Sequence, residues 1–210
     1  MGPGRQARLL IAAWALLAGG AGNAAPGQQL FATCAPCHGA RAEGVSATNA
    51  PALAGQHAVY LQRQLQNFRS GVRGVHKADV HGAQMRAAVT ALRDDAAVAS
   101  VASFVATLPK TTVKPAARVD MRNGNNLYQG KCGACHGGKA EGNASLSTPR
   151  LAGLDAAYLK RQYQHFRDGV RGTHPQDRYG RQMSVMANVL PTDKDLDDVI
   201  AFIHTMGAAQ

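Results

Sequence analysis

Two stretches of the chain share one pattern, CAPCH at residues 34–38 and CGACH at residues 132–136. In each, a histidine directly follows the second of two cysteines that stand three positions apart. This C-x-x-C-H pattern is typical of covalent haem c attachment. Two thiols about one helical turn apart can each add to a vinyl group, and the adjacent histidine is then held under the iron. The pattern therefore predicts two haem c groups. Their attachment and iron-binding residues are Cys34, Cys37 and His38 in the first motif and Cys132, Cys135 and His136 in the second.

The two motifs contain all four cysteines of the chain, so three other interpretations have to be weighed. A C-x-x-C pair can be a redox dithiol or half of a zinc site. In an exported chain, four cysteines can also form two disulfides. None of these alternatives requires a histidine directly after the second cysteine. That arrangement occurs twice here, which favours haem.

The first 25 residues have the pattern of a signal peptide. Arg5 and Arg8 form a basic start, an apolar run from Leu9 to about Ala18 follows, and small residues at 22–25 are suited to cleavage. The apolar run is shorter than the roughly 20 residues that span a bilayer. An uncleaved N-terminal anchor is the alternative interpretation. Either way, the sequence predicts an exported protein.

The chain is basic, with a formal net charge of +10. Removing residues 1–25 takes away two arginines and no acidic residue, so the charge falls by two, from +10 to +8. Such a surface suits docking to acidic patches on partner proteins, or it serves solubility alone. Nucleic acid is not expected as a partner, because the chain is exported and has no basic stripe interleaved with aromatic residues.

The sequence also contains one unit twice. A shift of 98 residues aligns residues 34–108 with 132–206 without a gap, and 33 of the 75 pairs are identical. A match of this extent indicates two copies of one domain. We therefore expect domain 1 at residues 26–108, a linker at 109–120 and domain 2 at 121–210. The shared blocks include Pro-x-Leu-Ala-Gly (51–55 and 149–153), Tyr-Leu-x-Arg-Gln (60–64 and 158–162) and Phe-Arg-x-Gly-Val-Arg-Gly-x-His (68–76 and 166–174).

Apolar residues at helical spacing, and the absence of an alternating strand pattern, predict an all-α fold. We expect three helices in each copy: one leading into the haem motif (28–34 and 125–132), a second at 58–70 and 156–168, and a closing helix. The closing helices should bury Val98, Val101, Ala102 and Val105 in the first copy and Leu196, Val199, Ile200 and Ile203 in the second. Thr192-Asp193 resembles a helix N-cap.

The group on the other side of each iron decides the chemistry, because methionine closes the site whereas an open position admits small molecules. Met85 and Met183 are the two methionines that match between the copies, each 47 residues after its haem histidine. Each follows Gly-x-Gln, which we interpret as a loop. We predict that these methionines are the second axial ligands. Core filling is one alternative, and ligation by the shared histidines His76 and His174 is another.

Further shared residues are candidates for supporting roles. Pro51 and Pro149 each lie 13 residues after the haem histidine, where a backbone carbonyl could accept the Nδ1 proton. Arg73 and Arg171 could pair with haem propionates. A simple turn and a solvated face are the respective alternatives. Ordinary surface roles are expected for the histidines without a counterpart, which are His57, His81, His165 and His204.

With these motifs, the chain resembles the tandem diheme class I cytochromes c of the cytochrome c4 type. The resemblance implies two cytochrome c domains, each wrapped around one covalent haem c, with His38/Met85 and His136/Met183 ligation. It also implies a periplasmic electron carrier rather than an enzyme, serving for example a cytochrome bc complex and a terminal oxidase. A diheme subunit that accepts electrons from a periplasmic dehydrogenase is the first alternative, and a diheme peroxidase is the second.

The two copies differ in one respect that bears on this resemblance. Phe31 precedes its cysteine by three residues, whereas Tyr128 precedes its own by four. The sequence therefore leaves open how the lead-in helix of domain 1 packs.

Overall fold

The computed structural model describes residues 26–113 and 119–208, together with Met1. The rest of the predicted signal peptide and residues 114–118 of the predicted linker lie outside the described residues. The described part is helical, and its β-structure is limited to two isolated bridges, Val45–Ala50 and Asn143–Thr148. The main helices are α1 (Pro26–Phe31), α2 (Ala35–His38), α3 (Ala58–Arg69), α4 (Val80–Ala88), α5 (Asp95–Thr107), α6 (Met121–Lys131), α7 (Gly133–His136), α8 (Ala156–Arg167), α9 (Arg178–Met186) and α10 (Asp193–Ala208).

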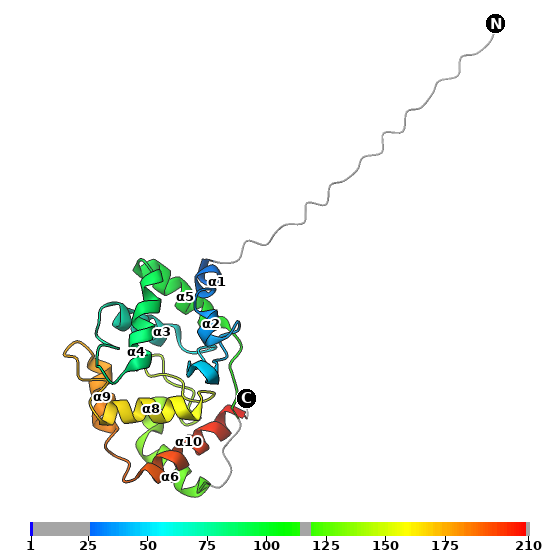
Figure 1. Cartoon of the computed structure of the whole chain (residues 1–210). Helices are drawn as coiled ribbons and strands as arrows, with labels where there is room; N and C mark the ends of the chain where they lie inside the picture. The colour runs from blue at the N-terminus through cyan, green and yellow to red at the C-terminus, as the bar shows by residue number, and fades with distance from the viewer. Residues whose placement is uncertain (2–25, 114–118, 209–210) are drawn as a thin grey trace.

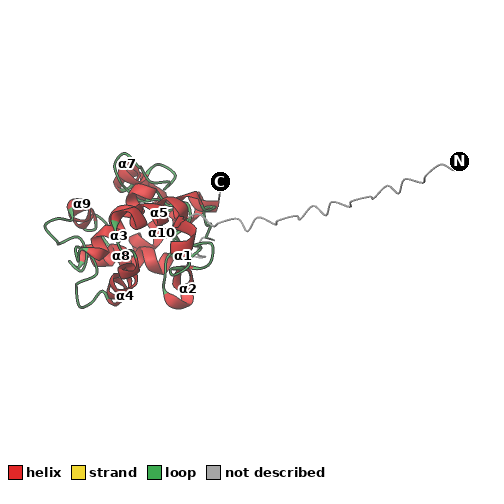
Figure 2. Cartoon of the chain, turned by 90° about the horizontal axis from the view of Figure 1, so that it is seen from above, coloured by secondary structure: helices red, strands yellow, loops and turns green. Residues whose placement is uncertain are grey.

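The helices form two bundles, α1 to α5 and α6 to α10, which lie one above the other in Figure 1 and are seen from above in Figure 2. In each bundle the first helix packs against the closing helix, α1 on α5 and α6 on α10. Short 3-10 turns at Ser46–Thr48 and Val89–Ala91 complete the first bundle. The prediction of an all-α protein with two tandem domains is confirmed.

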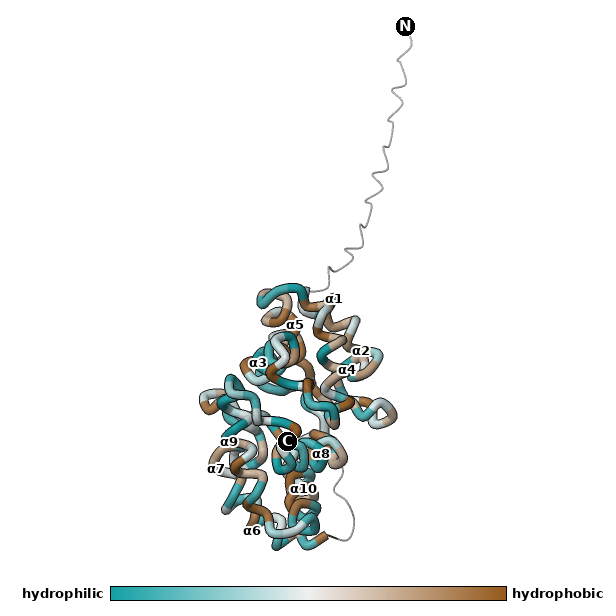
Figure 3. The backbone as a smooth tube through the Cα atoms, turned by 60° about the vertical axis from the view of Figure 1, so that its left-hand side comes forward, coloured by the Kyte–Doolittle hydropathy of each residue, from teal (hydrophilic) through white to brown (hydrophobic). Residues whose placement is uncertain are grey.

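The closing helices supply much of each core. All eight apolar residues predicted for their inner faces are buried, and hydrophobic positions gather along α5 and α10 in Figure 3. Thr192 caps α10 as expected, since its hydroxyl accepts a hydrogen bond from the Asp195 amide at 3.1 Å. The Asp195 carboxylate in turn accepts from the Thr192 amide, also at 3.1 Å, which completes a capping box.

The lead-in helices pack alike in both domains despite their one-residue difference. The Phe31 and Phe104 rings lie 5.8 Å apart, and the Tyr128 and Phe202 rings 5.9 Å apart, both pairs at an interplanar angle of 51°. A glycine four residues before each aromatic lets the helices approach closely, because a Cβ on Gly124 would collide with the Asp198 carbonyl. The extra residue of domain 2 is absorbed between the aromatic and the first cysteine.

The segments around the two matching methionines are helices, so the prediction of a loop there is wrong. Met85 lies in α4 and Met183 in α9. Each helix begins at a buried aspartate: the Asp79 carboxylate accepts from the Gly82 amide at 2.8 Å, and Asp177 caps α9 in the same way. A Cβ on Gly82 would lie 2.8 Å from the Gly74 Cα. The glycine before Gln-Met therefore serves close backbone packing within a helix.

His204 is buried, so the surface role predicted for it is wrong. Only 2 % of it is exposed, and its Nε2 atom donates a hydrogen bond to the Leu154 carbonyl at 3.0 Å. Burial lowers the pKa of His204, and this outweighs the opposing effects of the Leu154 bond and the Asp155 charge. The corresponding residue of domain 1 is Ala106. At this position domain 2 thus contains a buried neutral imidazole where domain 1 has alanine.

We expect this imidazole to make domain 2 less stable in mild acid. Below the ordinary histidine pKa of about 6.5, the unfolded chain binds a proton that folded His204 resists, so the free energy of unfolding falls as the pH drops. The slope is at most about 1.4 kcal/mol per pH unit, the limit for one proton. Amide hydrogen exchange of α10 between pH 7 and pH 5 measures it, with α5 as the internal comparison. The variant His204→Gln should flatten the slope, and an unchanged slope in that variant would refute this origin.

Candidate functional site

Both C-x-x-C-H motifs form one short helical turn. In α2 the His38 amide donates to the Cys34 carbonyl at 3.0 Å, and in α7 the His136 amide donates to the Cys132 carbonyl at 2.9 Å. The turn ends at a glycine with a positive φ of 83° in the first motif and 84° in the second. A Cβ on Gly39 would collide with the carboxylate of Glu43, so the repeated Glu-Gly block closes this turn. The geometry holds each pair of thiols one helical turn apart.

The proximal histidines are fixed in one tautomer. Nδ1 of His38 lies 2.9 Å from the Pro51 carbonyl, and Nδ1 of His136 lies 3.1 Å from that of Pro149. A carbonyl only accepts, so Nδ1 carries the proton and the Nε2 lone pair is free for a metal. Burial lowers the pKa of both imidazoles, against the opposing effect of these hydrogen bonds. Both rings are therefore suited to bind iron in the neutral form.

The first thiol of each motif is not activated. Burial raises the pKa of Cys34 and raises that of Cys132 to about 11. A redox dithiol needs a lowered thiol pKa, so this environment disfavours that alternative. Among the described residues, no three histidine, cysteine or acidic side chains gather as a metal-binding group. The second cysteines, Cys37 and Cys135, are exposed.

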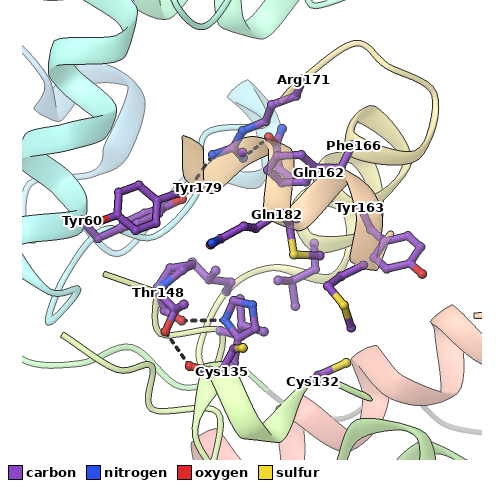
Figure 4. Close-up of a pocket in the computed structure, with 18 of the residues that line it drawn as sticks. Tyr60, Cys132, Cys135, Thr148, Gln162, Tyr163, Phe166, Arg171, Tyr179 and Gln182 are labelled. Carbon is purple, nitrogen blue, oxygen red and sulfur yellow. Dashed lines mark hydrogen bonds between the residues drawn. The ribbon is translucent and has the colours of Figure 1, made fainter. Parts of the chain in front are cut away.

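A cavity of about 200 Å³ opens beside the motif of domain 2. Cys132, Cys135 and His136 line it, and so does Met183 on α9, whereas His174 is not among its lining residues. Figure 4 shows Gln182, the neighbour of Met183, across this pocket from Cys135. His174 instead accepts the Gln176 amide within its own loop, at 3.2 Å. The cavity brings together the attachment residues and both predicted axial ligands of domain 2.

Two threonines support the motifs in a way the repeat does not reveal. The Thr48 hydroxyl donates to the Cys37 carbonyl at 3.0 Å, and the Thr148 hydroxyl donates to the Cys135 carbonyl at 2.5 Å. These residues are 100 positions apart, so the 98-residue alignment pairs Thr48 with Leu146 instead. The carbonyls of Cys37 and Cys135 are equivalent, yet the threonines that bind them stand at positions that do not align. A comparison of aligned residues therefore does not detect the two threonines.

Arg73 and Arg171 lie in the centre of the interface between the domains. Each is only 8 % exposed, so neither forms a solvated face. Arg73 donates to Gln64 at 2.7 Å and to Gln162 at 2.9 Å, while Arg171 donates to Gln162 at 2.6 Å and to Gln64 at 2.8 Å. Figure 4 shows Arg171 and Gln162 above the cavity of domain 2. The four side chains form a buried quartet with contributions from both domains.

The signal for this quartet was present in the repeated Tyr-Leu-x-Arg-Gln block. Helices α3 and α8 carry that block, and Gln64 and Gln162 are its last residues. The sequence analysis predicted haem-pocket or helix-packing roles for the tyrosines of this block but none for its two glutamines, because repetition alone does not indicate which polar side chains turn toward the other copy.

Further polar contacts between the domains, two of them through hydrogen bonds, break the symmetry of the repeat. The Gln56 side chain pairs with the backbone of Arg150 through two bonds, of 2.9 and 2.8 Å. His57 Nε2 donates to the Glu141 carbonyl at 3.0 Å. His165 lies 3.7 Å from the Asp79 carboxylate of the other domain. Surface roles predicted for His57 and His165 are therefore wrong, since both contribute to the interface.

Comparison with known proteins gives consistent matches. The cytochrome c family model matches residues 24–109 and again 121–207. Cytochrome c4 of Azotobacter vinelandii is 30% identical over 198 residues, covering 90% of this chain and 91% of that protein. The thiosulfate dehydrogenase electron acceptor of Stutzerimonas stutzeri (strain A1501) is 32% identical over 193 residues, covering 83% and 85%. The crystal structure of reduced cytochrome c4 from Pseudomonas stutzeri superimposes with a TM-score of 0.70 at 26% identity, covering 85% of this chain and 95% of that one.

The family match falls on both halves of the repeat, each of which contains one C-x-x-C-H motif. The chain accordingly binds two haem c groups covalently, one in each domain. It belongs to the cytochrome c family, as a tandem diheme member of the cytochrome c4 type.

Proposed function

We propose that this protein is a periplasmic carrier that accepts one electron at a time from one redox protein and delivers it to another, without substrate chemistry of its own. The observation that supports this most is the cavity of domain 2, where His136 and Met183 line the same space as the attachment cysteines. With His136 and Met183 as the two axial ligands, the iron would have no position left for a substrate. Domain 1 has His38 and Met85 at the matching positions.

Each residue then has a definite role. The cysteines hold the cofactor, while the Pro51 and Pro149 carbonyls orient the two histidines through bonds of 2.9 and 3.1 Å. Thioether ligation by Met85 and Met183 raises the reduction potential relative to bis-histidine ligation. Arg73 and Arg171 would offer guanidinium donors to the haem propionates. The haem supplies the one-electron reduction and oxidation, and the polypeptide excludes water and sets the potential.

The partners proposed are redox proteins with acidic docking patches. The mature chain would have a formal charge of +8, which favours rapid encounter with such surfaces. A cytochrome bc complex as donor and a terminal oxidase as acceptor fit a basic carrier in the periplasm. Within the described residues no helix is long and apolar enough to cross a membrane, and association with membranes is proposed only through partners or an uncleaved signal. Nucleic acid is not proposed as a partner.

A second candidate is the electron-accepting subunit of a periplasmic dehydrogenase. The thiosulfate dehydrogenase electron acceptor matched over 83% of this chain supports it. A peroxidase is less well supported, because it requires an iron position that hydrogen peroxide can reach.

Reduced protein exposed to carbon monoxide, and then mixed with candidate partners, tests this function. A carrier should bind little carbon monoxide at either haem and should be reoxidised rapidly by membranes that contain a terminal oxidase. The rate of reduction by a cytochrome bc complex, compared with that by thiosulfate and its dehydrogenase, separates the two candidate roles. Rapid carbon monoxide binding at one haem, together with turnover of hydrogen peroxide, would contradict the carrier function.

A further inference from the structure

Four arginines lie near the interface between the domains, and they form two pairs that are equivalent in the repeat. Each of the four has one buried N–H group that donates no hydrogen bond to any described residue. The Nε atoms of Arg63, Arg73, Arg161 and Arg171 are buried and have no hydrogen-bond partner in the part of the chain that the structure describes. Within the same part, none of the four forms an ion pair with a carboxylate. Buried guanidinium donors without an anion are costly. The charge of Asp177 acts on Arg63 and Arg171 without a close ion pair to either. The unused donors of the four arginines are therefore suited to carboxylates that a cofactor brings.

The inner pair, Arg73 and Arg171, is already held in place. Their terminal nitrogens bind Gln64 and Gln162, and each guanidinium lies over the phenylalanine of its own domain, at 4.5 Å from the Phe68 ring centre and 4.4 Å from that of Phe166. Both side chains therefore keep a fixed orientation between the domains.

The outer pair crosses from one domain to the other. Arg63, on α3 of domain 1, donates to the Ser147 carbonyl of domain 2 at 2.7 Å. Its guanidinium lies 4.2 Å from the ring centre of Tyr179, also in domain 2. Arg63, Ser147 and Tyr179 all line the cavity that contains His136 and Met183. An arginine of the first domain thus forms part of the haem site of the second.

Arg161 makes the corresponding contact in the opposite direction. It lies on α8 of domain 2 and donates to the Asn49 carbonyl of domain 1 at 3.0 Å. Asn49 is the counterpart of Ser147 in the 98-residue repeat. It stands two residues before Pro51, whose carbonyl binds His38. Each outer arginine therefore reaches the loop that orients the proximal histidine of the other domain.

We propose that Arg63 and Arg161 each bind a propionate of the haem attached to the opposite domain, so that each haem is held by both halves of the chain. The proposal rests on the two covalent haem groups, one in each domain, and it extends the proposed carrier function. The propionates are the carboxylates that the cofactor brings, and a planar guanidinium matches a carboxylate with two parallel donors. Because a nearby cation favours the reduced, less positive haem, each outer arginine raises the reduction potential of the haem across the interface.

The test is a redox titration of the intact diheme protein in which each haem is followed separately by NMR. Signals of the two haems are assigned through contacts with their own cysteine side chains, so the assignment does not depend on the axial methionines. In Arg63→Gln, the equilibrium constant for reduction of the domain 2 haem should fall about tenfold, which is about 59 mV for one electron. The domain 1 haem should change much less. Arg161→Gln should give the mirror image.

Two comparisons separate charge from packing. Arg63→Lys keeps the charge, so it should preserve most of the potential that Arg63→Gln loses. Arg69→Gln is the matched control on the same helix, because Arg69 is exposed and pairs with Asp95 at 2.8 Å. It should shift neither haem appreciably.

Three outcomes would overturn the proposal. A shift confined to the domain 1 haem in Arg63→Gln would mean that this arginine serves its own domain. Equal shifts in the Gln and Lys variants, or no shift in either, would leave Arg63 only a structural donor to Ser147. Carbon monoxide binding or peroxidase turnover by the unaltered protein would instead count against the carrier function, independently of these shifts.

Discussion

Replacing Met183 with alanine should lower the reduction potential of the domain 2 haem and open its iron to carbon monoxide. Met183 lines the cavity with His136, and it is the proposed source of the thioether that favours ferrous iron. We expect a fall on the order of 0.1 V, a fraction of the roughly 0.8 V range that axial ligands span. Spectroelectrochemistry measures the potential, and the carbon monoxide difference spectrum of the reduced protein measures the open site.

Two controls make this result specific. Met85→Ala should produce the same changes at the domain 1 haem. Met186→Leu alters a methionine that also lines the domain 2 cavity. The 98-residue repeat aligns Met186 with Ala88, so this methionine has no counterpart in domain 1. It should leave the potential nearly unchanged and the iron closed. If Met183→Ala changes neither the potential nor carbon monoxide binding, Met183 is not the ligand, and His174→Ala becomes the next variant to measure.

The double variant Cys132→Ser and Cys135→Ser should retain one covalent haem and lose the fold of domain 2. At roughly 24 cal/mol for each Å³, a closed cavity of about 200 Å³ would cost about 5 kcal/mol, and because this one opens to solvent that figure is an upper bound. That is comparable to the whole stability of a small domain, which is about 5–15 kcal/mol. Hydrogen exchange should therefore show loss of protection in α6 and α10, while α1 and α5 remain protected more strongly.

The mirror variant, Cys34→Ser and Cys37→Ser, is the matched control and should reverse the pattern. If the amides of domain 2 in the first variant remained fully protected from hydrogen exchange, the apolar core of that domain would be stable without the haem. If both haems remained attached, the assignment of the cysteines would be wrong.

The repeat and the helical spacing predicted the fold well, because both depend on residues within one domain. The repeat shows that there are two copies, and the spacing shows which side of a helix is buried. The buried faces of α5 and α10 follow from apolar residues one helical turn apart, such as Val101 and Val105. Helices α4 and α9 were missed because glycines at 82 and 180 suggested loops. In the structure, aspartate caps begin both helices, and the glycines permit close backbone contacts.

What the sequence could not reveal is the pairing of the two domains. Gln64 and Arg63 belong to a block that repeats, yet each also has a hydrogen-bond partner in the other copy. His204 had no counterpart, and nothing in its neighbours indicated burial under the Leu154 carbonyl. The polar interface depends on how two nearly equivalent bundles dock, which is a non-local property. The hydrogen bonds from the haem histidines to the Pro51 and Pro149 carbonyls could be predicted from the sequence. Both prolines lie 13 residues after their histidine, and the same spacing in both copies pointed to a shared role.

The account depends on two haem groups bonded to the four cysteines. Intact mass spectrometry of the denatured, mature protein tests this most directly, because only covalently attached groups survive denaturation. The predicted mass is that of the polypeptide plus two haems. A mass equal to the polypeptide alone, or smaller by the four hydrogens lost in two disulfides, would contradict the central claim.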